Sequence, residues 1–356
     1  MDKTKNIFNP FRLSQYHFEE KKVMNQIKKL FDQAVHCHFP HPVGDVIGPE
    51  NFYKKSVGSI FKSMPDLERR DYIVISGTSD NDDKWVGCSG FYCGTFLYPF
   101  LNIPPTGHLA HIRFHEFYRF KENKIIEVQS IWDIPELMMQ ANAWPLAPSL
   151  GKEWCVPGPA TMDGIKLETG NTEKSATSLK TVVKMLDAMK RHPAKGGPEI
   201  MEMTKYWHPK LNWYGPSGIG TGRGIAGFRN WHQIPFLKAM PDRGETVKYN
   251  DPNGQITDIS YHFFAEDDYV AVTGWPNMTQ TLSHDGWLGI APSNKKIQIR
   301  SLDFWRLENG TIRENWVLLD LLDIYHQIGI DVFARLKEFN KSRSFQGNKS
   351  YVGAVI

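Results

Sequence analysis

The sequence predicts an α+β fold of two tandem conical barrels, in each of which a curved antiparallel sheet wraps around N-terminal helices. Three observations support this prediction: a repeat that covers most of the chain, a helical pattern at the start of each copy, and strand-like segments after it. Such a cone buries one face of its sheet and leaves an open mouth, which suits a small-molecule pocket.

The repeat is clearest in residues 113–140 and 300–327, which align without a gap at an offset of 187. Seven of the 28 aligned positions are identical. Average residue usage in proteins predicts only about two identities by chance. These pairs are Arg113/Arg300, Phe117/Phe304, Arg119/Arg306, Ile125/Ile312, Glu127/Glu314, Asp133/Asp320 and Gln140/Gln327. Upstream, Met64-Pro65-Asp66 matches Met240-Pro241-Asp242 at an offset of 176, which predicts an insertion of 11 residues within 242–258.

Helix-like and strand-like patterns follow the same order in both copies. Helical spacing of apolar residues occurs at Val23, Ile27, Leu30, Phe31 and Ala34, and again at Leu179, Val182, Val183, Leu186 and Met189. Residues 72–76, 261–264 and 269–273 are rich in β-branched and aromatic residues, as strands are. An Asn-Gly turn within Glu308–Thr311 predicts a hairpin between residues 304–307 and 312–319.

These patterns divide the chain into five segments. We expect an N-terminal arm at 1–18, a first domain at 19–145, a linker at 146–175, a second domain at 176–338 and a C-terminal tail at 339–356. The length of 356 residues also suits two domains better than one.

Composition excludes several classes of partner. A net charge of +3 provides no electrostatic footprint for nucleic acid. No apolar run reaches the 18 residues of a membrane span, so we expect no membrane partner. The polar N-terminus and four cysteines without framework spacing predict a cytoplasmic protein with free thiols.

One motif resembles a known family. Residues 314–329 read Glu-Asn-Trp-x-x-x-Asp-x-x-x-Ile-x-x-Gln-Ile-Gly, which is similar to the C-terminal signature of the SnoaL-like polyketide cyclases, in the nuclear transport factor 2-like superfamily. The resemblance implies intramolecular aldol condensation by an acid/base aspartate, without metal or cofactor. It places that role on Asp320, and on Asp133 in the first copy. Where the family often has Thr-His, the first copy has Thr95-Phe96, and the second has a displaced histidine, His284.

The residues around Asp320 allow two interpretations. Strand alternation puts Glu314, Trp316, Leu318 and Asp320 on one face, and an apolar pocket there would raise the pKa of the carboxyl toward that of a useful base. Alternatively, Asp320 is the N-cap of the helix that follows it. The two roles are compatible.

The neighbouring strands offer two faces for substrate binding. Arg113 and His115 share one face, and Arg300 lies on the equivalent face of the second copy, where an inward-pointing arginine would bind a carboxylate or an oxyanion. If the arginines instead point outward, Asp303 and Trp305, on the opposite face, line the pocket. Candidate acid/base partners are His262 and His284.

The leading hypothesis is a cofactor-independent cyclase, isomerase or lyase that acts on a hydrophobic, polyketide-like carbonyl compound through aspartate acid/base catalysis. We expect no metal, since the histidines of residues 36–41 lack a matching acidic pair. The second copy has the fuller signature and is the expected active unit. Two alternatives remain open: a non-catalytic small-molecule binding protein, and a structural duplicate paired through its sheets. Assembly into a homodimer is also left open.

Overall fold

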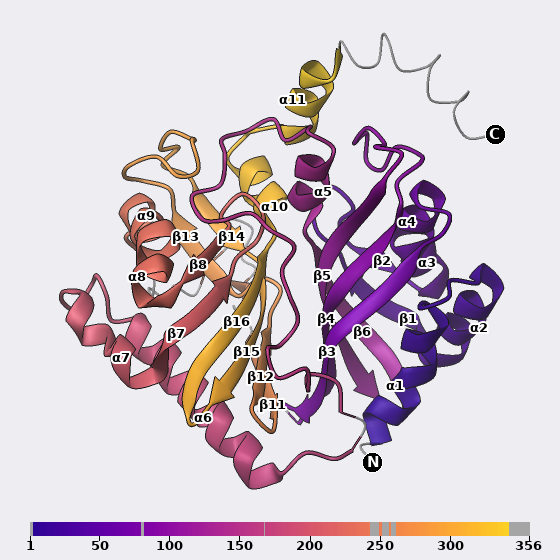
Figure 1. Cartoon of the computed structure of the whole chain (residues 1–356), viewed down its shortest axis with the longest axis horizontal. Coiled ribbons are helices and arrows are strands. Elements are labelled where there is room, and N and C mark those ends of the chain that lie inside the picture. The colour runs from indigo at the N-terminus through magenta and orange to yellow at the C-terminus, as the bar shows by residue number, and fades with distance from the viewer. Residues whose placement is uncertain are drawn as a thin grey trace.

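The computed structural model describes residues 3–79, 82–166, 168–242, 249–250, 256–257 and 261–341. Two α+β units lie side by side, with their sheets facing each other in the middle and their helices on the outer sides (Figure 1). Each unit contains one six-stranded sheet. The predicted fold class is therefore confirmed.

The first unit forms the sheet β2-β1-β6-β5-β4-β3. Its elements are α1 (Lys3–Ser14), α2 (Glu20–Leu30), β1 (Phe31–His38), β2 (Val46–Ile47), α3 (Pro49–Lys55), α4 (Val57–Ser63), β3 (Glu68–Thr78), β4 (Lys84–Thr95), β5 (Leu109–Lys121), β6 (Lys124–Trp132) and α5 (Ile134–Gln140).

The second unit forms the sheet β11-β12-β15-β16-β7-β8, which matches the first strand for strand. Its helices are α6 (Thr172–Met189), η1 (Pro198–Met201), α7 (Met203–Tyr206), α8 (Gly224–Phe228), η2 (Arg229–Gln233), α9 (Ile234–Ala239), α10 (Leu321–Gln327) and α11 (Val332–Phe339). Its strands are β7 (Trp207–Tyr214), β8 (Thr221–Arg223), β9 (Tyr249–Asn250), β10 (Ile256–Thr257), β11 (His262–Glu266), β12 (Tyr269–Thr273), β13 (Met278–Thr281), β14 (Lys296–Ile299), β15 (Ser301–Glu308) and β16 (Thr311–Leu319).

Each sheet is antiparallel except for one pair. The first and last long strands of a unit, β1 with β6 and β7 with β16, run parallel. Parallel pairing needs a long connection, and most of the unit lies between these two strands in the chain. The expectation of a purely antiparallel sheet is corrected to this extent.

The predicted hairpin at Glu308–Thr311 is confirmed, since β15 and β16 pair directly across it. Asn309 and Gly310 both have positive φ, as a two-residue turn of the right twist requires. In the first unit Glu122 and Asn123 also have positive φ, without a glycine. The turn is therefore kept in both copies although its sequence differs.

Two expected features near the N-terminus differ from the structure. The first helix pattern was expected to continue to Ala34, but α2 ends at Leu30 and Phe31 begins β1. Residues 3–14, expected as part of an arm, form α1, which takes the place of α6 at the repeat offset. Phe8 and Phe11 of α1 are completely buried, so this helix belongs to the first core.

Aromatic side chains fill the first cone. The ring of Phe8 lies 4.7 Å from that of Tyr118, and the ring of Phe11 lies 5.2 Å from that of Phe31. Beside them Arg69 donates to Glu116 at 2.6 Å, and both side chains are buried. The first cone is thus a packed core.

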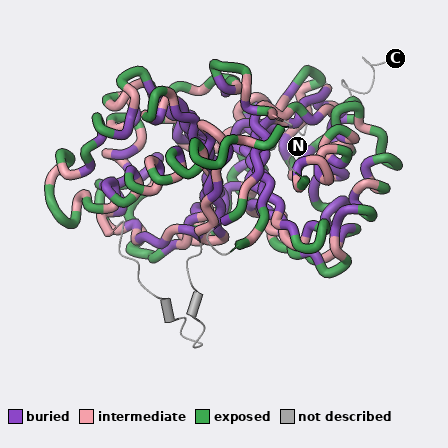
Figure 2. The backbone as a smooth tube through the Cα atoms, turned by 90° about the horizontal axis from the view of Figure 1, so that it is seen from below, coloured by how far each residue is buried: buried purple, intermediate pink, exposed green. Residues whose placement is uncertain are grey.

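A second core joins the two units along a seam between their sheets. There the rings of Phe117 and Phe304 stack at 5.0 Å, and His115 Nδ1 lies 2.6 Å from the carbonyl oxygen of Leu302. Both contacts join residues that are equivalent in the repeat, so the units are related by an approximate two-fold axis through these positions. Figure 2 shows buried backbone concentrated where the units meet.

Two equivalent aspartates clamp this seam. Asp133 Oδ2 accepts hydrogen bonds from Arg113 Nη2 and from the backbone N–H of Ser217 in the second unit, each at 2.9 Å. The equivalent Asp320 Oδ2 accepts from Arg300 Nη1 at 3.3 Å and from the backbone N–H of His41, in the first unit, at 3.0 Å. The second carboxylate oxygen of each caps the helix that follows, which confirms the N-cap interpretation.

The segment expected as a linker, 146–175, covers the seam. Its Pro157 carbonyl accepts a hydrogen bond from Trp316 Nε1 at 2.9 Å, and Val156 is buried in the second core. Its last residues, from Thr172, already belong to α6. The expected insertion within 242–258 and the tail beyond 341 lie largely or wholly outside the described residues.

We predict that Phe304→Ala destabilises the whole chain, because it removes a completely buried ring from the seam. The expected loss is about 3–5 kcal/mol of unfolding free energy, measured by urea denaturation. Tyr98→Ala, at a position that is 57% exposed, is the control and should change stability by less than about 0.5 kcal/mol. A Phe304→Ala variant as stable as this control would show that the seam is not required.

The free energy of unfolding should also depend on the protonation of the Asp133 and Asp320 carboxyl groups. Burial, with a contribution from Asp323, raises the pKa of Asp320 to about 7, and burial raises the pKa of Asp133 to about 7. Between pH ~4 and pH ~7 the folded carboxyls keep protons that the unfolded chain has released, so stability falls as the pH rises through this window. The apparent Tm of the native protein should therefore fall more from pH 5 to pH 7.5 than that of Asp320→Asn.

The control for this prediction is Asp285→Asn, since Asp285 is an exposed aspartate of the same unit. That variant should keep the native pH dependence. Equal slopes for the native protein and Asp320→Asn would contradict the expected titration of Asp320.

Candidate functional site

The second cone retains a cavity of about 80 Å³. Three structural layers line it: helix α6, the inner face of the sheet, and the α8–η2–α9 segment. The lining residues are Met185, Leu186, Met189, Trp207, Trp213, Phe228, His232, Phe236, Met278, Ser301, Asp303, Trp305, Asn315, Val317 and Leu319. The wall is therefore mostly aromatic and apolar, with a few polar groups on the strands.

The carboxylate among these lining residues belongs to Asp303. Asp303 and Trp305 are two residues apart on β15, so both side chains point to the inner face of the sheet. Leu302 and Phe304, at the other positions of the strand, face the seam. Ser301 Oγ donates to Asp303 Oδ1 at 2.5 Å. The hydroxyl thus holds a carboxylate at the cavity wall, with the amide-bearing Asn315 opposite Trp305 on β16.

Two tryptophans give the cavity wall hydrogen-bond donors. Trp207 and Trp305 are each 2% exposed, and neither indole Nε1 has an acceptor among the described residues. A buried donor without an acceptor costs free energy, which a ligand oxygen would recover. This arrangement fits a ligand that carries a carbonyl or hydroxyl oxygen.

His232 lines the cavity although the sequence did not single it out as a candidate acid/base residue. It lies in η2, a π-helical turn, and its ring stacks on Trp213 at 4.1 Å. Such π-helical insertions occur often at functional sites. The Trp231-His232 pair was visible in the sequence, but the π-helical turn that turns His232 inward and leaves Trp231 half exposed was not.

The predicted site residues divide into two groups. Asp303 and Trp305 line the cavity, as expected if the arginines point outward. Asp133, Asp320, Arg113, Arg300 and His115 lie instead at the seam and do not line the cavity. Burial and the charge of Arg113 lower the pKa of His115 well below its usual value, so this histidine is neutral. These five were expected in a pocket because strand parity groups residues by face but does not say which face is inside.

The three remaining candidates also lie outside the cavity lining. Trp316 packs in the second core under the linker. His262 lies against Trp85 of the first unit, at a ring distance of 5.1 Å. His284 is exposed in a loop, where its Nδ1 meets Ser283 Oγ at 2.8 Å. Their contacts are those of seam or surface residues.

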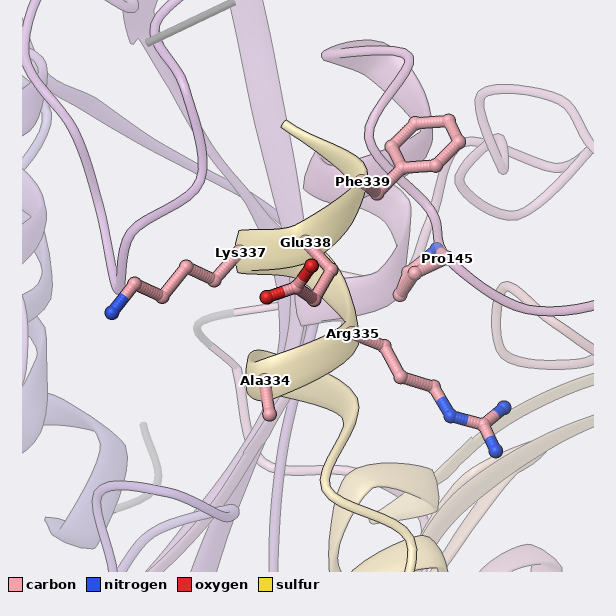
Figure 3. A pocket seen from close by; sticks show the side chains of 6 residues that line it. All are labelled: Pro145, Ala334, Arg335, Lys337, Glu338 and Phe339. Carbon is pink, nitrogen blue, oxygen red and sulfur yellow. The ribbon is translucent and has the colours of Figure 1, made fainter. Parts of the chain in front are cut away.

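A larger hollow, of about 590 Å³, lies beside α11 at the surface. It is lined by Pro145, Ala334, Arg335, Lys337, Glu338 and Phe339. Figure 3 shows Arg335 and Lys337 pointing away from each other. The charged groups there do not converge on one point, so the smaller cavity of the second cone is the better candidate.

Within the described part of the chain, no three His, Cys, Asp or Glu side chains come together as metal ligands. None of the helices in that part is long and apolar enough to cross a membrane.

Comparison with solved structures finds chains that align over nearly their whole length with about two fifths of this chain. An Agrobacterium tumefaciens SnoaL-like polyketide cyclase is 21% identical, with a TM-score of 0.32, and covers 39% of this chain and 98% of its own. Wild-type IdmH from Streptomyces antibioticus is 15% identical, with a TM-score of 0.33, and covers 39% and 99%. An NTF2-like protein of unknown function from Burkholderia pseudomallei is 10% identical, with a TM-score of 0.31, and covers 39% and 97%.

A search of curated proteins gives no match. A sequence model of the SnoaL-like polyketide cyclase family matches residues 14–141 and 252–328, which are more than half of the chain and fall in both units. The chain therefore belongs to the SnoaL-like polyketide cyclase family.

Proposed function

We propose that the second cone binds a compact, hydrophobic carbonyl compound and that Asp303 is the acid/base group of a cyclase- or isomerase-type reaction. Family membership supports this type of function. The observation that carries the proposal is a carboxylate set in the aromatic wall of the cavity. It transfers the expected aspartate role from Asp320 and Asp133, which clamp the seam, to Asp303.

The chemistry needs a base and a donor. Asp303 would remove a proton from the carbon next to the substrate carbonyl, and the resulting enolate oxygen would carry negative charge. The indole N–H groups of Trp207 and Trp305 are available donors for that oxygen. Proton return from the Asp303 carboxyl to another carbon completes an isomerisation. In a cyclisation the enolate carbon attacks a second carbonyl of the same molecule, and the alkoxide that forms takes the proton from the Asp303 carboxyl.

The size of the cavity limits the substrate. A volume of about 80 Å³ is small beside the roughly 300–1,000 Å³ of common ligand pockets. Met185 and Met189 lie in the wall, and methionine side chains adapt readily to new shapes. A compact substrate fits best, and a larger one requires these side chains to move.

A non-catalytic binding protein is the second candidate. The mostly apolar lining and the small volume favour it, since a ligand would be held largely by burial. The two candidates differ in what Asp303 does. In a binding protein it orients the ligand, whereas in an enzyme it must exchange a proton.

We predict that Asp303→Asn lowers turnover by about 100-fold or more while ligand binding persists. Asparagine keeps the shape and still accepts the Ser301 hydrogen bond, but it cannot act as a base. The measurement is deuterium incorporation next to the carbonyl, followed by NMR, across a panel of hydrophobic ketones and β-keto esters. Binding is followed by the fluorescence of the tryptophans that line the cavity.

The matched variant is Asp320→Asn, which changes a buried aspartate at the seam and should leave exchange within a few-fold of the native rate. Loss of exchange in folded Asp320→Asn with normal exchange in Asp303→Asn would overturn the assignment. Binding of panel compounds without exchange by the native protein would favour the binding protein.

We also predict that Trp305→Phe weakens binding of a carbonyl ligand about three- to tenfold, the effect of one hydrogen bond. Phenylalanine keeps the aromatic wall but lacks the N–H. Isothermal titration calorimetry measures the change, with Trp231→Phe, at a half-exposed position outside the cavity, as control. Unchanged affinity in Trp305→Phe would exclude this donor from ligand recognition.

A further inference from the structure

The carboxylate of the second cone has a counterpart in the first cone. Asp303 and Glu116 correspond at the repeat offset of 187. Glu116 on β5 pairs with Ser130 on β6. Asp303 on β15 pairs with Val317 on β16, which is the same register, because residues 130 and 317 differ by the same offset. Both carboxylates therefore project from the same point on the inner face of their sheet.

In the first cone this carboxylate binds a cation. Arg69 Nη1 donates to Glu116 Oε2 at 2.6 Å, and the guanidinium lies over the ring of Phe114, 4.2 Å from its centroid. Asp71 Oδ1 lies 2.9 Å from Arg69 Nη2. Arg69 is buried, and burying a charge is costly unless it is paired. The carboxylates and the aromatic ring therefore make a buried cation stable in this cone.

The second cone offers the same two kinds of group. Asp303 provides the carboxylate, and Ser301 Oγ donates to it at 2.5 Å. Trp305 lies two residues further along β15 on the same face, and β7 adds Trp207 and Trp213 to the wall. Tryptophan attracts a cation more strongly than phenylalanine or tyrosine does. The carboxylate and the tryptophan rings of this cone are therefore complementary to a small organic cation.

The two cones differ in what fills the space next to the carboxylate. In the first cone the side chain of Arg69, from β3, lies there among aromatic rings. In the second cone a cavity of about 80 Å³ is lined by Asp303. The guanidinium of Arg69 thus shows, within the same chain, the kind of group that the second cone can take from outside.

We propose that the second cone takes a compact carbonyl compound that carries a positively charged amine on the carbon next to the carbonyl. The ammonium lies against Asp303 and Trp305, and the indole N–H groups keep the carbonyl oxygen. Because the amine is attached to the carbon that loses the proton, Asp303 reaches both, and the positive charge stabilises the enolate. This inference names the substrate class of the proposed function and rests on its assignment of the second cone as the ligand site.

The test compares two pairs of probes on the full-length protein. Acetonyltrimethylammonium and methyl neopentyl ketone have nearly the same shape, and only the first carries a charge. Tetramethylammonium and tert-butyl alcohol form a second such pair without a ketone. Isothermal titration calorimetry measures the affinity of each probe, and deuterium incorporation next to the carbonyl is followed by NMR for the two ketones.

We expect the charged member of each pair to bind at least about tenfold more tightly than the neutral one. Asp303→Asn should reduce this preference to within about threefold, because asparagine keeps the shape and the Ser301 hydrogen bond but not the charge. Asp285→Asn, at an exposed position of the same unit, should keep the native preference. The comparison within the native protein stands even if Asp303→Asn does not fold.

Exchange separates this inference from the proposed reaction. Each ketone's rate is divided by its acetate-catalysed rate, which corrects for the greater acidity of the charged ketone. Equal affinity for charged and neutral probes, or a preference that persists in folded Asp303→Asn, would overturn the cation site, and exchange of the neutral ketone through Asp303 would leave the proposed function standing. Binding of the cations that depends on Asp303, without exchange of either ketone, would overturn the proposed reaction while supporting the cation site.

Discussion

The face-to-face contact of the two sheets is the constraint on which the rest of this structure depends. Each sheet has an outer face that would expose aromatic and aliphatic side chains if the unit stood alone, and the seam buries both faces. Phe117 with Phe304, and His115 with Leu302, meet near the approximate two-fold axis. The apolar faces of both sheets are thus buried within one chain.

This constraint explains which positions the repeat keeps. Asp133 and Asp320 each accept a hydrogen bond from an arginine of their own unit and another from a backbone N–H of the other unit, so changing either residue removes an acceptor that the two units share. Gln140 in α5 donates a hydrogen bond to the backbone of β5, and Gln327 in α10 donates one to the backbone of β14. These identical pairs are architectural, and identity between the copies is therefore a poor guide to catalytic residues here.

The interiors of the cones, which take no part in the seam, have diverged. Helix α1 and its phenylalanines fill the first cone, whereas the second keeps a cavity. In the first unit β4 and β5 form one long hairpin. In the second unit the equivalent hairpin is interrupted between β12 and β13, where Asn277 exchanges two hydrogen bonds with the backbone of Ser301. Ser301 also binds Asp303, so this interruption lies next to the proposed catalytic carboxylate. A raised pKa alone would have pointed elsewhere, to the buried aspartates of the seam.

The sequence by itself determined the fold class, the repeat, the turn at Asn309-Gly310 and the grouping of residues by strand face. These follow from local rules: helical spacing, strand alternation and turn chemistry act over a few residues. Only the tertiary structure decided which face of each sheet points into a cone, because alternation is the same whichever side is buried. In the folded chain Asp320 and Arg300 lie at the seam, whereas Asp303 and Trp305 line the cavity. The inward position of His232 depends likewise on its contacts with Trp213 on β7 and with neighbouring helices, which no local pattern encodes.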